Sequence, residues 1–234
     1  MIMHKLQLVN DQITTACIAA GRSPLQVRLL AVSKKFGADA VIAAIAGGQR
    51  AFGENYIAEG VEKILALQAW QAAPSEKPDA PLEWHCIGPV QSNKTRLVAE
   101  HFDWVQTLDR LKIAQRLDEQ RPSGLAPLQV CIQVNIDGGA TKAGVSPQDL
   151  PALVDAVRRL PRLNLRGLMT IPEPATDFAA ACALHARARV LFDALNAPGL
   201  ALDTLSMGMS ADLDAAIRAG STMVRVGSAI FGQR

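Results

Sequence analysis

One lysine of this chain stands where a lysine can act as a nucleophile. Lys34 closes the run Leu-Leu-Ala-Val-Ser at residues 29–33, and Gly37 follows it closely. An apolar run of this length, bounded by a charge and a glycine, is typical of a buried strand. Because burying an ammonium is unfavourable, the lysine is expected at the strand end, where partial desolvation favours a Schiff base with a carbonyl compound. The alternative is an ordinary solvated lysine.

Two loops of small residues near the C-terminus are candidates for binding an anion. In the first, residues 207–210 lead directly into a predicted helix, and in the second Val226 is followed by Gly227 and Ser228. Free N–H groups at a helix start can bind a phosphate. The alternative for Ser210 is a plain N-cap residue, whose side chain satisfies those N–H groups itself.

Three more polar residues stand beside apolar runs. Arg225 lies inside an apolar strand, so it needs a partner, either Asp212 or Asp214 in a structural ion pair or a bound ligand. For His85 the favoured interpretation is a satisfied core histidine. Asn55 follows a short strand, and its simple alternative is that it begins the next helix.

The composition indicates one large domain and excludes several function classes. The chain has 234 residues, of which 49% are hydrophobic and only 4% aromatic, so the core is aliphatic, as in helices packed on a parallel sheet. The net charge is +2 with acids and bases interspersed, which argues against nucleic acid as a partner. We expect no signal peptide and no membrane span, because no apolar stretch is long enough for either. Because the four cysteines are far apart, we also expect no metal site and a cytoplasmic protein with reduced thiols. These cysteines are Cys17, Cys86, Cys131 and Cys182.

Strand and helix patterns alternate along the whole chain. The proline-rich residues 72–81 are expected to form a surface loop and not a domain linker, since the alternation resumes beyond them. This alternation predicts a single α/β domain that spans residues 1–234 and forms a (β/α)8 barrel with an extra N-terminal helix. The alternative is an open parallel sheet. In a barrel the polar strand ends gather at one mouth, and the loops after strands seven and eight often bind phosphate. Strands are expected at 29–34, 51–55, 83–88, 104–109, 128–136, 165–171, 204–209 and 223–230, with a first helix over about 2–20.

At this point the motifs resemble those of the pyridoxal phosphate homeostasis proteins. They occur in the family's order and cover nearly the whole chain. The matching stretches are Leu30-Ala31-Val32-Ser33-Lys34, Phe52-Gly53-Glu54-Asn55-Tyr56, residues 84–94, Arg166-Gly167-Leu168-Met169-Thr170-Ile171-Pro172, residues 206–212 and residues 224–232.

The resemblance implies a barrel like the N-terminal domain of alanine racemase, with pyridoxal 5′-phosphate (PLP) held as an internal aldimine on Lys34. It also implies that Arg225 faces the pyridine nitrogen. The phosphate would be held by Ser210, Gly227 and Ser228, and the pocket would be lined by Asn55, His85, Ser206 and Met207.

Two places depart from the family pattern. The family often carries a second basic residue and a proline soon after the lysine, whereas Lys35, Phe36 and Gly37 stand here. The first loop is therefore expected to differ. The loop before Lys142 often contains an acid in the family, and this chain has Gly139, so a role of Lys142 in cofactor transfer stays open.

The same residues bear on whether the protein is an enzyme. Racemisation needs a base on each face of the cofactor, and the racemase family takes its second base from a tyrosine of another domain. The one tyrosine here is Tyr56. A guanidinium at Arg225 would leave the ring unprotonated and a weak electron sink. We therefore expect a monomeric carrier that exchanges PLP with apo PLP-dependent enzymes, and no catalytic residue. The alternatives are a weak racemase-like PLP enzyme, or a sugar-phosphate barrel enzyme that uses Lys34 without a cofactor.

Overall fold

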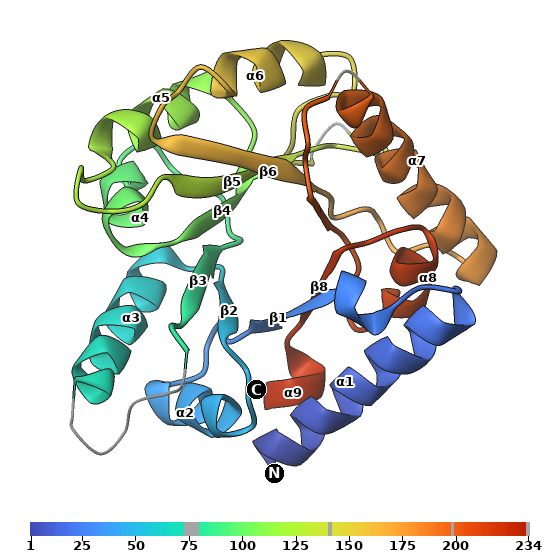
Figure 1. The fold of residues 1–234 in the computed structure, drawn as a ribbon, viewed down its shortest axis with the longest axis horizontal. Coiled ribbons are helices and arrows are strands. Elements are labelled where there is room, and N and C mark those ends of the chain that lie inside the picture. The colour runs from blue at the N-terminus through green and yellow to red at the C-terminus, as the bar shows by residue number, and fades with distance from the viewer. Residues whose placement is uncertain (73–79, 140–141, 198, 233–234) are drawn as a thin grey trace.

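Eight parallel strands close into a barrel in sequence order, with the first strand paired to the last (Figure 1). The computed structural model describes residues 1–72, 80–139, 142–197 and 199–232, so most of the loop expected at 72–81 lies outside the described residues. The predicted (β/α)8 barrel is confirmed, and the open sheet is wrong. The strands are β1 Arg28–Val32, β2 Ala51–Glu54, β3 Glu83–Cys86, β4 Trp104–Leu108, β5 Leu128–Gln133, β6 Leu163–Met169, β7 Thr204–Ser206 and β8 Met223–Val226.

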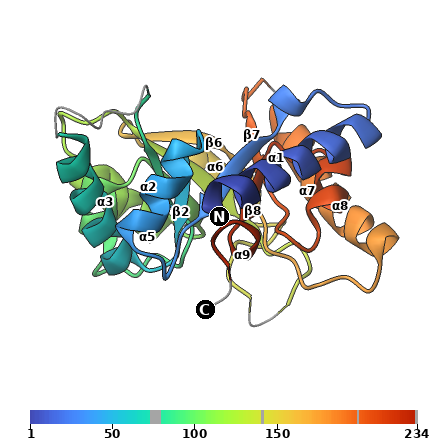
Figure 2. The same cartoon turned by 90° about the horizontal axis from the view of Figure 1, so that it is seen from below.

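Helices form a ring around the barrel (Figures 1 and 2). The predicted N-terminal helix is present as α1, and it packs against α8, α9 and α2. Its buried residues recur at helical spacing, which is why its sequence predicts it. The helices are α1 Ile2–Ala19, α2 Ala38–Ala46, α3 Ile57–Gln71, α4 Thr95–His101, α5 Leu111–Gln120, α6 Leu150–Val157, α7 Phe178–Asn196, α8 Leu213–Arg218 and α9 Ser228–Phe231, and a 3-10 turn spans Pro24–Gln26.

Alternate residues of a strand face opposite sides, and this divides the core into two layers. Ala31 belongs to the large layer between the barrel and the helices. Leu30 and Val32 belong to a smaller cluster with Met223 that fills part of the barrel. Arg225 is in register with Leu30 on the neighbouring strand, so its side chain also points into the barrel.

Several elements end earlier than the sequence predicts. Strand β8 stops at Val226, because the backbone leaves the sheet at Gly227 and continues as α9. Strand β1 stops at Val32, so Lys34 lies in the loop that follows. Helix α8 begins only at Leu213 with Asp212 as its N-cap, and the N-cap interpretation of Ser210 is therefore wrong.

Candidate cofactor site

The junction of β1 and β8 brings Lys34 close to the last loop of the chain. Ala31 is in register with Val226, and a Cβ added at Gly227 would lie 3.1 Å from the backbone oxygen of Val32. A side chain there would force the Val32 backbone to shift by a few tenths of an ångström, so glycine suits this close approach. The loop that carries Lys34 and the loop that starts at Gly227 therefore meet at the carboxyl end of the barrel, where barrels place their ligands.

Lys34 has an exposed side chain on a loop whose two flanking residues are fixed. Before it, the backbone oxygen of Ser33 accepts a hydrogen bond from Lys63 Nζ at 2.9 Å. After it, the backbone N–H of Lys35 donates to Glu59 Oε1 at 2.5 Å, and Lys35 has a φ of 67°. Such a φ is uncommon for a non-glycine residue and marks a backbone held by its surroundings.

A buried acid, Glu54, and a buried lysine, Lys63, hold the start of this loop through Ser33. Lys63 Nζ lies 2.6 Å from Glu54 Oε1, and Ser33 Oγ donates to the same oxygen at 2.5 Å. Burial raises the pKa of Glu54, although Lys63 and Ser33 oppose the rise. This cluster is not among the predicted site residues. The signal for it was an acid inside an apolar strand, which needs a buried partner.

Arg225 is anchored by Ser206 of β7 and by Thr170, which directly follows β6. Its Nη1 donates to Ser206 Oγ at 2.8 Å and its Nη2 to the backbone oxygen of Thr170 at 2.8 Å. Burial lowers the pKa of Arg225 to about 10, and the negative charge of Asp212 acts in the opposite direction. The group is still protonated at neutral pH. In the described part of the chain, Arg225 forms no ion pair with either candidate partner, because Asp212 pairs with His185 and Asp214 accepts from Gln12.

The predicted pocket residues Ser206 and His85 are linked through Gln106, which is not among the predicted site residues. Ser206 Oγ donates to Gln106 Oε1 at 2.7 Å, and Gln106 Nε2 lies 2.9 Å from His85 Nδ1. His85 Nε2 lies 2.7 Å from Glu83 Oε1. The only sequence signal for Gln106 was a polar residue inside the fourth predicted strand.

His85 is the satisfied core histidine that the sequence favours. It is fully buried and stacks on Trp104, with ring centroids 4.9 Å apart and planes 14° apart. Burial lowers its pKa, and the hydrogen bond to Glu83 opposes that shift. Three hydrogen bonds separate it from Arg225.

Ser210 is exposed on the loop between β7 and α8. Asp212 holds this loop, because its carboxylate accepts from the Met209 N–H at 2.6 Å and pairs with His185 Nε2 at 2.9 Å. Burial would raise the pKa of Asp212, but these two contacts outweigh it and keep the pKa below its usual range. Gly208, before the loop, has a φ of 95° and touches Ala216, so a side chain there would be strained and would clash.

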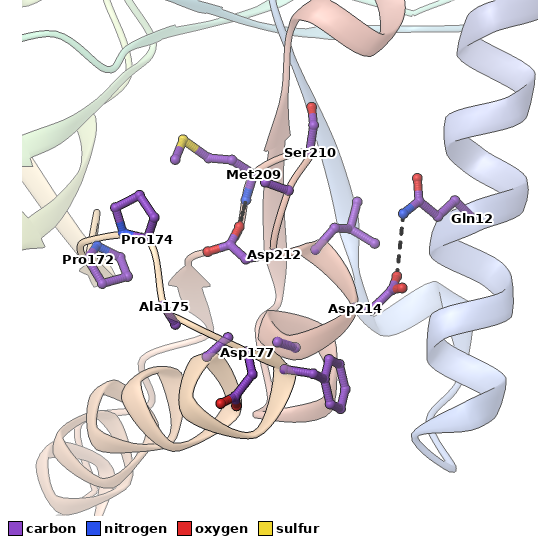
Figure 3. Close-up of a pocket in the computed structure, with 14 residues that line it drawn as sticks. Gln12, Pro172, Pro174, Ala175, Asp177, Met209, Ser210, Asp212 and Asp214 are labelled. Carbon is purple, nitrogen blue, oxygen red and sulfur yellow. Dashed lines mark hydrogen bonds between the residues drawn. The ribbon is translucent and has the colours of Figure 1, made fainter.

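A pocket of about 370 Å³ lies beside this loop (Figure 3). It is formed by residues 172–178 after β6, residues 209–215 and Gln12 of α1. Ser210 contributes to its wall, whereas Lys34 and Arg225 do not. The pocket therefore flanks the barrel mouth on its outer side.

The remaining predicted pocket residues occupy different places. Asn55 is half-buried after β2, and its backbone is so close to Gly88 that no side chain fits there. It does not start the helix, because Tyr56 is the N-cap of α3. Met207 is fully buried in the layer between barrel and helices, so its side chain does not face the barrel mouth.

Lys142 is held more firmly than its glycine-rich loop suggests. Its Nζ lies 3.1 Å from Glu173 Oε1, 3.3 Å from Asp137 Oδ2 and 3.1 Å from the backbone oxygen of Ile171. Its side chain is 19% exposed. Lys142 is therefore a partly buried, ion-paired residue and not a freely solvated loop lysine.

The residues at the mouth fit the parts of PLP. Lys34 offers an amine for an aldehyde, and the loops at Ser210 and at Gly227 and Ser228 offer hydroxyl and backbone N–H groups of the kind that bind a phosphate. Arg225 uses two N–H groups on protein acceptors, which leaves guanidinium donors for a ring nitrogen. The nearby Thr170 Oγ1 is a buried polar atom without a partner in the described part of the chain, as expected where a ligand completes the site.

Comparison with known proteins shows the family of the chain. The family model described as "Alanine racemase, N-terminal domain" matches residues 15–234. A protein of Pseudomonas aeruginosa named pyridoxal phosphate homeostasis protein is 56% identical over 233 residues, which cover 100% of this chain and 96% of the relative. The chain belongs to the pyridoxal phosphate homeostasis protein family. The Escherichia coli K12 member of the same name is 52% identical, over 100% of this chain and 97% of its own.

Solved structures place the fold in the same family. PipY of Synechococcus elongatus PCC7942, solved with PLP bound, has a TM-score of 0.83 and 36% identity, over 99% of this chain and 100% of its own. Alanine racemase of Clostridium difficile 630 has a TM-score of 0.72 at 16% identity, over 99% of this chain and 57% of its own. The racemase likeness shows the barrel fold alone. Both agree with the fold that the sequence motifs implied.

The described residues also bear on metal binding and on membrane insertion. Among the described residues, no group of histidine, cysteine and acidic side chains could hold a metal ion. None of the described helices is both long and apolar enough to span a membrane.

Proposed function

We propose that this protein binds PLP and acts in PLP homeostasis, as a carrier that holds the cofactor and releases it to apo enzymes. Its full-length relatives are named for that role, and PipY was solved with PLP bound. The observation that carries the proposal is the junction of β1 and β8, which brings the Lys34 loop to the Gly227 loop. Arg225 lies on β8 at the same junction, and its side chain points into the barrel interior.

The proposed contacts follow from these positions. Lys34 provides the amine for the aldehyde, and Ser210, Gly227 and Ser228 provide the phosphate loops. Arg225 faces the ring nitrogen, with Asn55 and Ser206 beside it and His85 behind Ser206. We leave Met207 out of the contact set, because its side chain packs in the outer core layer.

Bound PLP supplies an aldehyde that reacts reversibly with amines and a ring that accepts electrons when its nitrogen is protonated. Arg225 keeps its proton at neutral pH, since its pKa is about 10, and it therefore donates a hydrogen bond without delivering a proton. This favours storage and exchange over chemistry at an amino-acid α-carbon. Tyr56 is 52% exposed at the N-cap of α3, a surface position that does not suit a buried second base.

Purified protein tests the proposal directly. The protein is incubated with PLP, reduced with borohydride and digested, and the modified lysine is identified by mass spectrometry. We expect the label on Lys34, and we expect the unreduced complex to reactivate an apo PLP-dependent enzyme. Absence of PLP binding would refute the proposal and would favour a cofactor-independent barrel enzyme.

The second candidate function, a weak PLP-dependent enzyme with Lys34 as its base, is separated by isotope exchange. Amino acids are incubated with the loaded protein in deuterated water and followed by NMR. A carrier leaves the α-hydrogen in place. Sustained exchange that disappears in Lys34→Ala would favour the enzyme instead.

A further inference from the structure

A row of hydrogen bonds crosses the interior of the barrel from β3 to β8. It passes from Glu83 through His85, Gln106 and Ser206 to Arg225. We propose that Gln106 is a positioning residue, which fixes the hydroxyl of Ser206 and thereby the guanidinium of Arg225, while His85 holds the Gln106 amide in one orientation. The inference rests on the proposed function, because Arg225 is the residue assigned to the ring nitrogen.

Three contacts determine the orientation of the Gln106 amide. Its Nε2 faces His85 Nδ1 at 2.9 Å and Met223 Sδ at 3.1 Å, and its Oε1 accepts from Ser206 Oγ at 2.7 Å. Reversing the amide would place its oxygen against the sulfur and its NH2 against the serine hydroxyl. The hydroxyl hydrogen would then have no acceptor, and the amide oxygen would face the lone pair of His85 Nδ1. The observed orientation is the one in which every donor has an acceptor.

His85 supplies the fixed acceptor at the other side of Gln106. Its Nε2 lies 2.7 Å from the carboxylate of Glu83, which is itself paired with Arg28. The ring nitrogen facing a carboxylate carries the proton, so Nδ1 is free to accept from Gln106. Stacking on Trp104 holds the ring plane, and burial keeps the ring neutral by lowering its pKa.

Ser206 transmits this order to Arg225. Because the Ser206 hydroxyl donates its only hydrogen to Gln106, a lone pair is left for Arg225 Nη1 at 2.8 Å. The second anchor of the guanidinium is the backbone oxygen of Thr170. Without the oxygen of Gln106 the hydroxyl is free to rotate, and the guanidinium keeps one firm anchor instead of two. Its remaining donors then no longer have a fixed direction.

Three variants separate positioning from packing. Gln106→Met keeps the length of the side chain but removes its amide. Gln106→Glu keeps an acceptor for Ser206 and keeps a hydrogen bond to His85, either as the protonated acid that donates to Nδ1 or as a carboxylate that accepts from a protonated ring. Thr107→Val is the matched control, because Thr107 is the next residue of β4, is buried, and donates to Gly88 outside the row. It loses one buried hydrogen bond and leaves the row intact.

The first measurement uses the protein without cofactor, so it does not depend on PLP binding. Side-chain nitrogen NMR is expected to show His85 as the neutral Nε2–H tautomer in the parent protein. The guanidinium signal of Arg225 is expected to shift in Gln106→Met and to stay in place in Thr107→Val. An Nδ1–H tautomer of His85 in the parent protein, or an unmoved Arg225 signal in Gln106→Met, would overturn the proposal.

The second measurement is affinity for PLP and for its analogue with carbon in place of the ring nitrogen. Gln106→Met is expected to weaken PLP binding by about tenfold, the worth of one charge-assisted hydrogen bond, and to leave the analogue within about twofold. Gln106→Glu and Thr107→Val are expected to stay within about twofold for PLP. Equal losses for PLP and the analogue would show a packing role and refute positioning. If the parent protein failed to bind PLP, the proposed function would fail, and the NMR result would still decide whether Gln106 orders Arg225.

Discussion

The ring of Phe36 stacks on the ring of Phe231, with centroids 5.3 Å apart and planes 30° apart. Phe36 follows Lys34 in the first loop, and Phe231 ends the helix that begins at Ser228. The contact ties the loop of the reactive amine to one of the proposed phosphate loops. It also gives a structural role to the position at which the sequence departs from the family pattern.

Phe36→Leu is expected to lower the free energy of unfolding by about 1 kcal/mol, since an aromatic pair contributes about that much beyond its buried area. PLP affinity should fall as well, because the two loops are no longer held together. Denaturant unfolding and PLP titration measure the two effects. Phe178→Leu is the control, as that ring is 54% exposed on α7; equal effects of the two changes would contradict the coupling.

Lys63→Met should destabilise the protein by about 3–5 kcal/mol, because it leaves the fully buried Glu54 without its charge partner. The double variant Lys63→Met with Glu54→Gln should recover part of the loss. Unfolding by urea measures both. Arg96→Met breaks an exposed pair with Glu100 at 3.5 Å and should cost no more than about 1 kcal/mol. A loss that small for Lys63→Met would mean that Glu54 is protonated in the folded protein.

Lys34→Ala is expected to abolish covalent attachment of PLP while leaving the protein folded, because the side chain is exposed and takes little part in the core. Lys142→Ala should retain attachment, since Lys142 is engaged by Glu173 and Asp137. The measurement is borohydride trapping followed by peptide mass spectrometry, with melting temperature as the check on folding. A label that persists in Lys34→Ala would identify another lysine as the reactive one.

Ser210→Ala should weaken PLP binding by about 1–2 kcal/mol through loss of one hydrogen bond to a charged group. Its effect on pyridoxal, which lacks the phosphate, should be close to zero. Equilibrium titration with both compounds provides the comparison. Were the parent protein to bind both equally well, the loops after β7 and β8 would not be an anion site.

Stability should depend on pH through His85. Burial puts its folded pKa below the ordinary value of 6.5, so below about pH 6.5 the unfolded chain binds a proton that the folded chain does not. The free energy of unfolding therefore falls as the pH drops from 6.5 toward the folded pKa, and is unaffected by this group above 6.5. His85→Gln removes that slope, whereas His4→Gln, at an exposed position of α1, retains it. If the free energy of unfolding showed the same dependence on pH in the parent protein and in His85→Gln, the pKa of His85 would not be lowered by folding.

Much of the architecture is present in local sequence patterns. Short apolar runs such as 128–133 and helical spacing such as that of Leu6, Val9 and Ile13 depend on residues close together in the chain, so they predict the eight strands and the N-terminal helix without a tertiary model. The motifs around Lys34 and Arg225 likewise predict the family. Strand ends are less determined by sequence, because Ala229 and Ile230 continue the apolar pattern of the eighth strand while the backbone has already left the sheet.

What only the tertiary structure decided is which polar groups meet. Arg225 had two open interpretations, and its partners turned out to be Ser206 and the oxygen of Thr170, contributed by other strands. Gln106 carried no sequence signal beyond its strand, yet it joins His85 to Ser206. Closure of the barrel creates these contacts, because it brings side chains from distant strands into one interior where each buried polar group must find a partner. Local sequence determines which way each strand faces, and the register of the closed sheet determines what each side chain touches.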